Sequence, residues 1–251
     1  MLSFSKTIIS RASGENQKGT SIFDPVLCEI IYNWFCTKGG IVYDPFAGGS
    51  VRGVVAELLD RKYIGIDLSE KQIDANQINA DKFGVCPAWH CDDSKNADRY
   101  LPDDSADLVF SCPPYHNLEK YSDHPLDLSN MNYDDFIEAY REIISIACRK
   151  LKENRFAVFV VGDIRDSKGA YRDFISHTKR IFRDCGLFLY NDIVLLNVCG
   201  TAAMRAEKPF ASNRKVTKTH QNVLVFYKGD IKEIKGSFEN QFEWADLSKL
   251  K

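Results

Sequence analysis

The sequence predicts an α/β fold, with one mostly parallel sheet and helices on both of its faces. Apolar runs alternate with amphipathic helical stretches almost from the start of the chain, which is the order expected of a parallel sheet with crossover helices. The 251 residues, 44% of them hydrophobic, suffice for one large domain, and no segment resembles a linker between two cores. A single α/β domain is therefore expected.

About seven strands are expected from the apolar runs. They fall at residues 41–47, 63–68, 88–91, 106–111, 155–164, 187–198 and 222–229. The run at 155–164 is unusually apolar, which favours a central position in the sheet. The last two runs lie on either side of a basic segment, and they can pair antiparallel at one edge.

Helices are expected between these strands. They fall at residues 24–36, 50–60, 70–82, 133–151 and 171–185. The first begins at Asp24 and Pro25, because Asp is a favoured N-cap and Pro suits the first turn. The fourth has apolar residues at i, i+3, i+4 and i+7, the pattern of a long amphipathic helix.

The bulk composition narrows the class of protein. No stretch approaches the roughly 18 apolar residues of a membrane helix, and the first residues lack the apolar core of a signal peptide. We therefore expect a soluble, cytoplasmic protein with no membrane partner. Eight cysteines include no Cys-x-x-Cys pair and mostly lie in apolar runs, which predicts reduced, buried thiols and no metal.

Polar residues follow the first three strands at the places where α/β sheets bind ligands. The turn Asp44-Pro45-Phe46-Ala47-Gly48-Gly49-Ser50 follows the first strand, and its glycines allow a ligand close to the backbone. Asp67 ends the second strand, where a carboxylate can accept bonds from two ribose hydroxyls. Asp92 or Asp93 closes the third strand and can accept from an adenine amine. Taken singly, each of these acids is more often a cap or a solvated loop residue, and the pattern lacks the glycines and lysine of a phosphate cradle.

The fourth strand runs directly into Ser111-Cys112-Pro113-Pro114-Tyr115, and a polar loop then extends through residues 116–130. Two prolines ordinarily just end a strand, because proline lacks an N–H and cannot continue a ladder. The aromatic ring and the polar loop after them are typical of a functional loop on a rigid scaffold.

A basic segment lies at residues 201–220, although the net charge of the whole chain is −2. It has little apolar periodicity and is expected to form a loop. It sets five basic residues against the single acid Glu207: Arg205, Lys208, Arg214, Lys215 and Lys218. Such a run is usually a solvated face. Beside a catalytic site it would instead hold the phosphates of a polyanion.

The order of DPFAGGS, GIDLSEKQ, CDDS, SCPPY and THQNVLVFYKG resembles the S-adenosylmethionine-dependent DNA methyltransferases that modify exocyclic amines of bases. The resemblance covers nearly all of residues 21–230. It implies a seven-stranded, Rossmann-like methyltransferase sheet whose last strand is inserted antiparallel. The implied domains are a flexible segment at 1–20, the methyltransferase domain at 21–230 and a tail at 231–251. Within the domain, 116–130 becomes an active-site loop, mobile without DNA, and 201–220 a DNA-contacting insert.

The resemblance also assigns residues to S-adenosylmethionine. The turn after the first strand would wrap the methionine end of the cofactor, Asp67 would hold the ribose, and Asp93, with Asp92 as the alternative, would meet the adenine. The segment SIFDPVLCEII is similar to the family's separate cofactor motif. The implied cofactor-binding set is Phe23, Asp24, Pro25, Asp44, Pro45, Phe46, Gly48, Asp67, Asp92 and Asp93.

For catalysis the resemblance implies that the Pro113 carbonyl and the side chain before it accept hydrogen bonds from the target amine. Tyr115 would stack on a base flipped out of the duplex, and the rigid prolines would aim the acceptors. The methyl group would move by direct displacement, without a general base of high pKa or a covalent enzyme intermediate. The implied catalytic residues are Ser111, Cys112, Pro113, Pro114 and Tyr115.

Cys112 departs from the family pattern, which has Asp, Asn or Ser at this position. A thiol is a weaker hydrogen-bond acceptor than any of these side chains. Three hypotheses follow: a small neutral residue equivalent to Ser, hence N4 of cytosine; a tolerated substitution in an enzyme for N6 of adenine; or chemistry that uses a thiolate. Size favours the first, and Ser111 can add a polar contact.

Other functions stay open. The Pro-Pro-aromatic motif also occurs in enzymes that methylate RNA guanosine or a protein amide, although no RNA-binding domain is visible in the sequence. Cys112 also permits a non-catalytic DNA-binding subunit with a methyltransferase fold. Because the basic segment is short, a recognition partner or a homodimer can also take part in recognising DNA.

Overall fold

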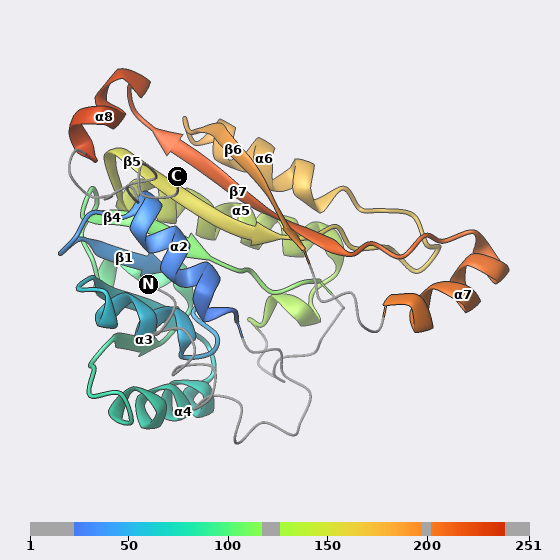
Figure 1. The fold of residues 1–251 in the computed structure, drawn as a ribbon, viewed down its shortest axis with the longest axis horizontal. Coiled ribbons are helices and arrows are strands. Elements are labelled where there is room, and N and C mark those ends of the chain that lie inside the picture. Colours follow the sequence, from blue (N-terminus) through green and yellow to red (C-terminus); the bar gives the residue numbers. More distant parts are fainter. Residues whose placement is uncertain (1–22, 117–125, 197–201, 239–251) are drawn as a thin grey trace, which may run out of the picture.

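The computed structural model describes residues 23–116, 126–196 and 202–238, with side chains from residue 206 onward in the last range. Its centre is a seven-stranded sheet in the order β3-β2-β1-β4-β5-β7-β6 (Figure 1). The strands are β1 (Ile41–Asp44), β2 (Lys62–Asp67), β3 (Ala88–Cys91), β4 (Ala106–Ser111), β5 (Leu151–Val161), β6 (Phe188–Leu196) and β7 (His220–Lys228). The first five are parallel, and β7 runs antiparallel between β5 and β6. The expected seven-stranded sheet with an antiparallel last strand is confirmed.

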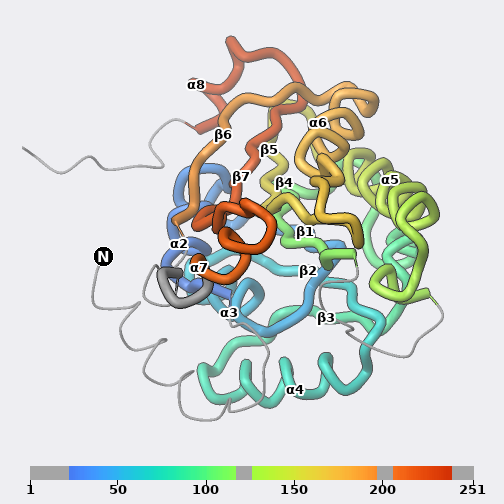
Figure 2. Tube along the Cα trace, turned by 90° about the vertical axis from the view of Figure 1, so that its right-hand side faces the viewer, coloured from blue at the N-terminus to red at the C-terminus, as the bar shows by residue number. Residues whose placement is uncertain are grey.

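Helices cover both faces of the sheet, as expected. They are α2 (Pro25–Phe35), α3 (Val51–Leu58), α4 (Glu70–Asp81), α5 (Tyr133–Lys150), α6 (Phe174–Asp184), α7 (Ala202–Asn213) and α8 (Ile234–Ser237), with short 3-10 helices η1 (Ser94–Arg99), η2 (Leu128–Asn130) and η4 (Ile231–Glu233). In Figure 2, α5 and α6 lie on one side of the central strands and α2 and α3 on the other.

The core forms two apolar layers because successive strand residues point to opposite faces. Val42 and Leu108 pack among residues of α2 and α3. Their neighbours Tyr43 and Val109 pack on the opposite face, among residues of α5 and α6. All six residues of β4 are buried, which places this strand at the centre of both layers.

Local sequence explains where several elements begin and end. Asp24 caps α2 by accepting a 2.8 Å bond from the Val26 N–H, and Pro25 occupies the first turn, as the sequence predicts. The first strand ends at Asp44 rather than at residue 47, because Pro45 removes a ladder donor and the Asp44 carboxylate takes the Phe46 N–H.

The segment after β6 differs from the expectation of a basic loop, because it contains the helix α7. Figure 1 shows α7 beyond the sheet, at the far end of the long β6–β7 pair. Residues 207–213 of this helix are exposed, so this part of α7 faces no core and no buried apolar stripe marks it in the sequence.

Residues 231–238, assigned to the tail from sequence, form η4 and α8. Phe238 packs on Phe156 of β5 with ring centroids 5.3 Å apart, and the Arg155 guanidinium lies 5.8 Å from the Phe238 ring centroid. These contacts join the start of the tail to the sheet.

Candidate active site

The sequence motifs meet at the carboxyl ends of the central strands. From β1 the chain continues outward through β2 and β3, and it then returns to β4 on the other side of β1. The reversal between β1 and β4 is a topological switch point, where open α/β sheets bind ligands. The predicted site residues lie at the carboxyl ends of these strands. They are the turn after β1, Asp67 at the end of β2, the acids after β3 and the segment after β4.

Asp44 holds the turn after β1 together from inside. Its carboxylate is fully buried. It accepts bonds from the Phe46 N–H at 3.1 Å, the Ser111 hydroxyl at 2.5 Å, the Arg52 Nε at 2.6 Å and the Tyr63 hydroxyl at 2.7 Å. A carboxylate offers about four acceptor positions, and these donors fill them. Direct contact with the cofactor thus stays a prediction for Asp44, whose visible role is to position the turn.

Arg52, at the start of α3, is a site residue that the sequence reading missed. Its guanidinium donates to the carbonyls of Phe46 at 2.7 Å and Ala47 at 2.9 Å, and it lies 4.7 Å from the Phe23 ring centroid. Burial is the largest single effect and acts to lower the pKa of Arg52, but the neighbouring groups, led by the Asp44 carboxylate, together raise the net pKa. The signal was a lone cation among the valines of VRGVV, directly after the glycine turn.

The glycines of this turn leave its outer side open. Gly48 has a φ of +51°, which favours glycine, and its carbonyl accepts a 2.7 Å bond from the Asn76 amide. A side-chain carbon built on Gly49 would meet no atom within 4 Å. A ligand can therefore approach the backbone here.

Asp67 keeps acceptor capacity for a ligand. One oxygen accepts the Gly48 N–H at 2.9 Å, and the other accepts the Ser69 N–H at 2.9 Å. Burial raises the pKa of Asp67, and these two backbone bonds oppose the rise. Since a carboxylate has about four acceptor positions, each oxygen can take one further donor, which is the capacity that a pair of ribose hydroxyls needs.

The two acids after β3 differ in their partners. Asp92 accepts from the Asp93 N–H at 2.8 Å, Asn96 at 2.7 Å, Tyr100 at 2.7 Å and Arg99 at 3.0 Å. Asp93 caps η1 through a single 3.0 Å bond from the Lys95 N–H. The spare acceptor positions on Asp93 favour it over Asp92 as the ligand-facing acid.

The segment after β4 divides its side chains between two environments. Ser111 is buried and donates to Asp44, so its hydroxyl belongs to the turn after β1. Cys112 is half-buried and packs against the apolar layer formed with α2 and α3. Burial raises the pKa of the Cys112 thiol to about 11. A thiol that is protonated near neutral pH supports the hypothesis of a small neutral residue over that of a thiolate.

Tyr115 is held from two sides. Its hydroxyl accepts a 2.8 Å bond from the Gln221 amide of β7, and its ring meets Phe174 edge to face with centroids 6.4 Å apart. Within the described residues, no donor reaches the carbonyl of Pro113. Gln221 was missed as a site residue, although it lies in the THQN stretch, because 106 residues separate it from Tyr115.

The segment before α2 reaches the same turn. The Phe23 ring lies between the Arg52 guanidinium and Phe110, whose ring centroid is 5.8 Å away. Asp24 is exposed and Pro25 is buried. Pro45, also buried, accepts the Ser94 hydroxyl at its carbonyl, and Phe46 packs on Tyr140 at 5.9 Å.

The basic residues spread from the sheet edge toward α7. Lys218 Nζ lies 3.8 Å from the Asp163 carboxylate, and Lys215 packs against Gly169, both in the segment after β5. Lys208 and Arg214 are exposed. Arg205 belongs to α7, but its side chain, like most of the predicted active-site loop at 117–125, lies outside the described residues.

The residues that the structure describes contain no helix with the length and apolar character needed to cross a membrane. They also contain no cluster of three or more His, Cys, Asp or Glu side chains suited to holding a metal ion.

Comparison with known proteins gives both a family match and fold matches. The DNA methylase family of N6 and N4 type matches residues 10–78 and 106–249. The type II methyltransferase M.BglII of Bacillus subtilis is 29% identical over 128 residues, which are 51% of this chain and 31% of that protein. This chain therefore aligns with about a third of that relative's length.

Two solved structures share the fold. TrmN from Thermus thermophilus superposes with a TM-score of 0.57 at 16% identity, over 82% of this chain and 49% of that one. A SAM-dependent methyltransferase from Methanosarcina mazei gives 0.52 at 14% identity, over 80% of this chain and 97% of that one. At these identities the likeness concerns the fold alone.

Proposed function

The chain belongs to the DNA methylase family of N6 and N4 type, and we propose that it transfers a methyl group from S-adenosylmethionine to an exocyclic amine of a DNA base. The observation that carries the proposal is the position of the SCPPY segment. It follows β4 at the switch point, and Ser111 bonds directly to the Asp44 that holds the glycine turn of β1. Acceptors for an amine therefore adjoin a turn open to a ligand.

The residues present fit the cofactor. Asp67 would accept the ribose hydroxyls with its two spare positions, the open side of Gly48 and Gly49 would face the methionine end, and Asp93 would take the adenine amine. When bound, S-adenosylmethionine supplies a methyl group on a positively charged sulfur. The chain's part is to hold that group in line with the incoming amine.

Pro113 and Tyr115 would act on the base. An exocyclic amine is a poor nucleophile because its lone pair is delocalised, and an acceptor placed where its hydrogens point favours the tetrahedral amine of the transition state. The Pro113 carbonyl meets this need. Stacking on Tyr115 would replace part of the base stacking lost on flipping, worth roughly 1–3 kcal/mol. The proton can leave after methylation, so no strong base is needed.

Cys112 bears on the choice of base. Because its thiol is small and neutral, we propose N4 of cytosine ahead of N6 of adenine. Cys112→Ser should retain or raise activity if the residue serves only as a small acceptor. Complete loss of activity in that variant would instead indicate a specific role for the thiol.

DNA would lie along the basic residues between the sheet edge and α7. Neutralising Arg214 and Lys215 together should weaken binding and reduce its salt dependence by about one unit of slope per lost phosphate contact. An unaltered slope would contradict the assignment. The predicted loop at 116–130 would close over the flipped base, and a recognition partner or a second copy can add sequence specificity.

The decisive test is incubation with cofactor and either DNA or RNA, followed by digestion and mass spectrometry of the nucleosides. We expect a methyl group on an exocyclic amine of a deoxynucleoside. Methylated RNA alone would favour the RNA alternative, and no product despite cofactor binding would favour a non-catalytic subunit. Methyl on C5 of cytosine would overturn the mechanism, since that reaction needs a cysteine adduct.

Tyr115 provides the matched variants. Tyr115→Ala should abolish turnover while cofactor affinity, measured by calorimetry, stays nearly unchanged, because the ring is assigned to the base. Tyr115→Phe keeps the ring but loses the bond from Gln221, so kcat/KM should fall by only about two- to tenfold. Equal loss of turnover in both variants would remove stacking as the role of Tyr115.

A further inference from the structure

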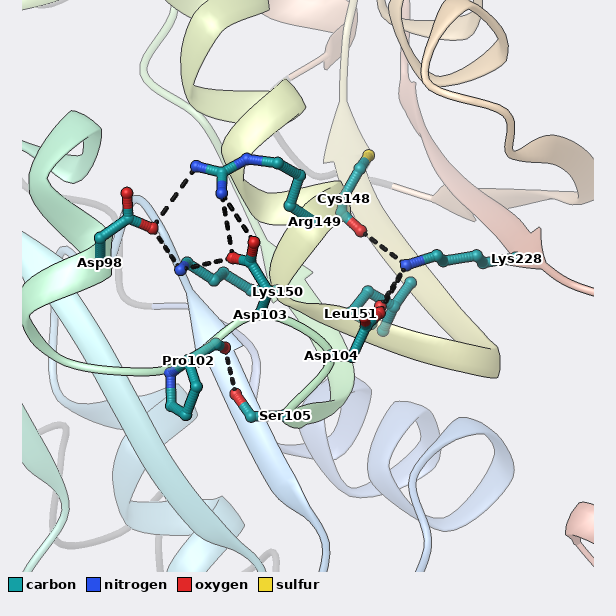
Figure 3. A network of polar contacts seen from close by, with 10 residues as sticks. All are labelled: Asp98, Pro102, Asp103, Asp104, Ser105, Cys148, Arg149, Lys150, Leu151 and Lys228. Carbon is teal, nitrogen blue, oxygen red and sulfur yellow. Dashed lines mark hydrogen bonds and ion pairs between the residues drawn. The ribbon is translucent and has the colours of Figure 1, made fainter.

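A second site lies between the carboxyl-terminal ends of α5 and α6, far from the switch point. It is a shallow groove of about 650 Å³, and its lining includes Ser145 and Cys148 of α5, Cys185 at the end of α6, and Lys228 of β7. Cys148 and Lys228 also belong to the polar network at the amino end of β4 and β5, where Lys228 donates to the Cys148 carbonyl at 3.2 Å (Figure 3). The groove and the proposed active site thus lie at opposite ends of the sheet.

The groove brings two thiols together. The Cys185 thiol lies 3.5 Å from the Ser145 hydroxyl, and Cys148 and Cys185 both line the groove. Ser145 and Cys148 are three residues apart on α5, so both face the same side of the helix. The end of α6 therefore places Cys185 directly against this face.

The two thiols differ in access. Cys148 is buried, with 5% of its surface exposed, whereas Cys185 is half-buried and borders the groove. A small molecule can therefore meet Cys185 first, and Cys148 is placed behind it. This order of attacking and resolving thiol is what disulfide exchange requires.

We propose that Cys185 and Cys148 form a thiol–disulfide exchange site that reacts with low-molecular-weight disulfides and closes into an internal disulfide between α5 and α6. The Cys185 thiolate attacks one sulfur of the small disulfide, forms a mixed disulfide and releases one small thiolate. The Cys148 thiol then loses its proton and attacks the Cys185 sulfur, which releases the second small thiol. The protein loses two electrons and two protons, and the small disulfide gains them.

The electrostatics agree with these roles. The hydrogen bond from Cys148 lowers the pKa of Cys185 to about 6, against the effect of burial. The same hydrogen bond raises the pKa of Cys148. The charged groups around the pair are Arg141, Glu142 and Arg149 on α5, Asp184 on α6 and Lys228 on β7. Cys185 is thus largely a thiolate at neutral pH, the form that attacks disulfides.

The test uses the full chain with oxidised glutathione as the probe, followed by intact mass and peptide mapping. The wild-type protein should lose two hydrogens, with one peptide linking Cys148 to Cys185, and dithiothreitol should reverse the change. Cys148→Ser should trap one glutathione on Cys185, because the resolving thiol is gone. Cys185→Ser should leave Cys148 unmodified.

Controls separate this site from the other thiols. Cys86 and Cys91 are exposed, so glutathione on them alone, without the crosslink, would overturn the proposal. Cys86→Ser should form the crosslink as the wild type does. Cys148→Ala removes the donor to Cys185 altogether, so the attack of Cys185 on oxidised glutathione at pH 6 should be slower in this variant than in Cys148→Ser.

The pH dependence of the wild-type reaction gives an independent readout. With a pKa of about 6, the initial rate at Cys185 should rise about tenfold from pH 5 to pH 7 and then level off. A thiol with an ordinary pKa near 8.5 would change roughly a hundredfold over the same range. A hundredfold change at Cys185, or wild-type protein without the crosslink, would refute the site.

Discussion

At the carboxyl end of the sheet, Asp44 is fully buried and pairs with Arg52, which is itself only 4% exposed. At the amino end, the carboxylates of Asp98 and Asp103 are about half exposed, and both pair with the buried Lys150 (Figure 3). Both ends thus join acids to a buried cation. They differ in whether the acid can reach water.

This difference determines how much stability each end loses when one partner of an ion pair is replaced. A buried charge that loses its partner has no solvent to compensate it, so breaking a buried pair is costly. A surface carboxylate that loses its partner is solvated at once, and exposed pairs contribute little. We therefore expect the carboxyl end to hold its side chains in fixed positions, as a ligand site requires. At the amino end, we expect the loss of one ion pair to have little effect on stability.

Arg52→Met should give the largest effect, because it leaves the Asp44 charge buried without a cation. We expect the free energy of unfolding to fall by about 3–5 kcal/mol, measured by urea unfolding. Arg52→Lys keeps the charge but cannot reproduce the two bonds to the Phe46 and Ala47 carbonyls, so its cost should be intermediate. A cost for Arg52→Met below about 1 kcal/mol would remove the distinction between the two ends.

Asp67→Ala tests ligand binding at the carboxyl end. The variant loses acceptors for the proposed ribose bonds, and this loss of charge-assisted bonds is worth about 1.5–3 kcal/mol, so cofactor affinity should fall by about 10- to 100-fold. Isothermal calorimetry with S-adenosylmethionine measures this. Asp104→Asn, at the amino end, is the control and should bind as the wild type does. Unchanged affinity of Asp67→Ala for S-adenosylmethionine would contradict the assignment of Asp67 to the ribose hydroxyls.

Elements that face the core were predicted from sequence best. The strands at 88–91 and 106–111 match β3 and β4 to the residue. All six residues of β4 are buried, which imposes an apolar run with sharp ends, whereas β3 buries only Trp89. The start of β5 was placed four residues late, at 155 instead of Leu151. Its first residue, Leu151, pairs with Ala106 of β4. The polar residues 152–155 follow, and Arg155 pairs with Lys228 of the distant β7, which local pattern cannot reveal. Helix α7 was missed for a related reason, because its residues 207–213 are exposed and face no core.

The site follows the same rule. Motif residues next to strand ends, such as Asp67 and Tyr115, were predicted because their position along the chain fixes their position at the sheet edge. Arg52 and Gln221 were missed because their roles come from tertiary partners. The sequence also assigned Asp44 to the cofactor, while its four donors come from four separate parts of the chain.

Gln221→Leu should have a moderate effect, confined to turnover. It removes the 2.8 Å bond to the Tyr115 hydroxyl, and a hydrogen bond of this kind contributes about 0.5–1.5 kcal/mol, so kcat/KM should fall by about two- to tenfold. Cofactor affinity should not change. In a Tyr115→Phe background the same substitution should add little, because the hydroxyl is already absent. Additive losses would show that Gln221 acts elsewhere.

Lys150→Met should have the smallest effect near neutral pH. Methionine keeps the packing of the lysine stem, and the exposed carboxylates of Asp98 and Asp103 keep Arg149 as a partner, so we expect a change within about 1 kcal/mol in the free energy of unfolding. The difference should appear in acid. The hydrogen bond from Lys150 lowers the pKa of both Asp98 and Asp103. Groups with lowered native pKa contribute stability above their unfolded pKa, about 3.9, and lose it as the pH falls through the native value. Urea unfolding from pH 7 down to pH 2 should therefore show a shallower acid decline for Lys150→Met than for the wild type. A decline as steep as that of the wild type would mean that these pairs do not control stability in acid. A loss of several kcal/mol at pH 7 would mean that Lys150, like Arg52, is essential to the stability of the fold.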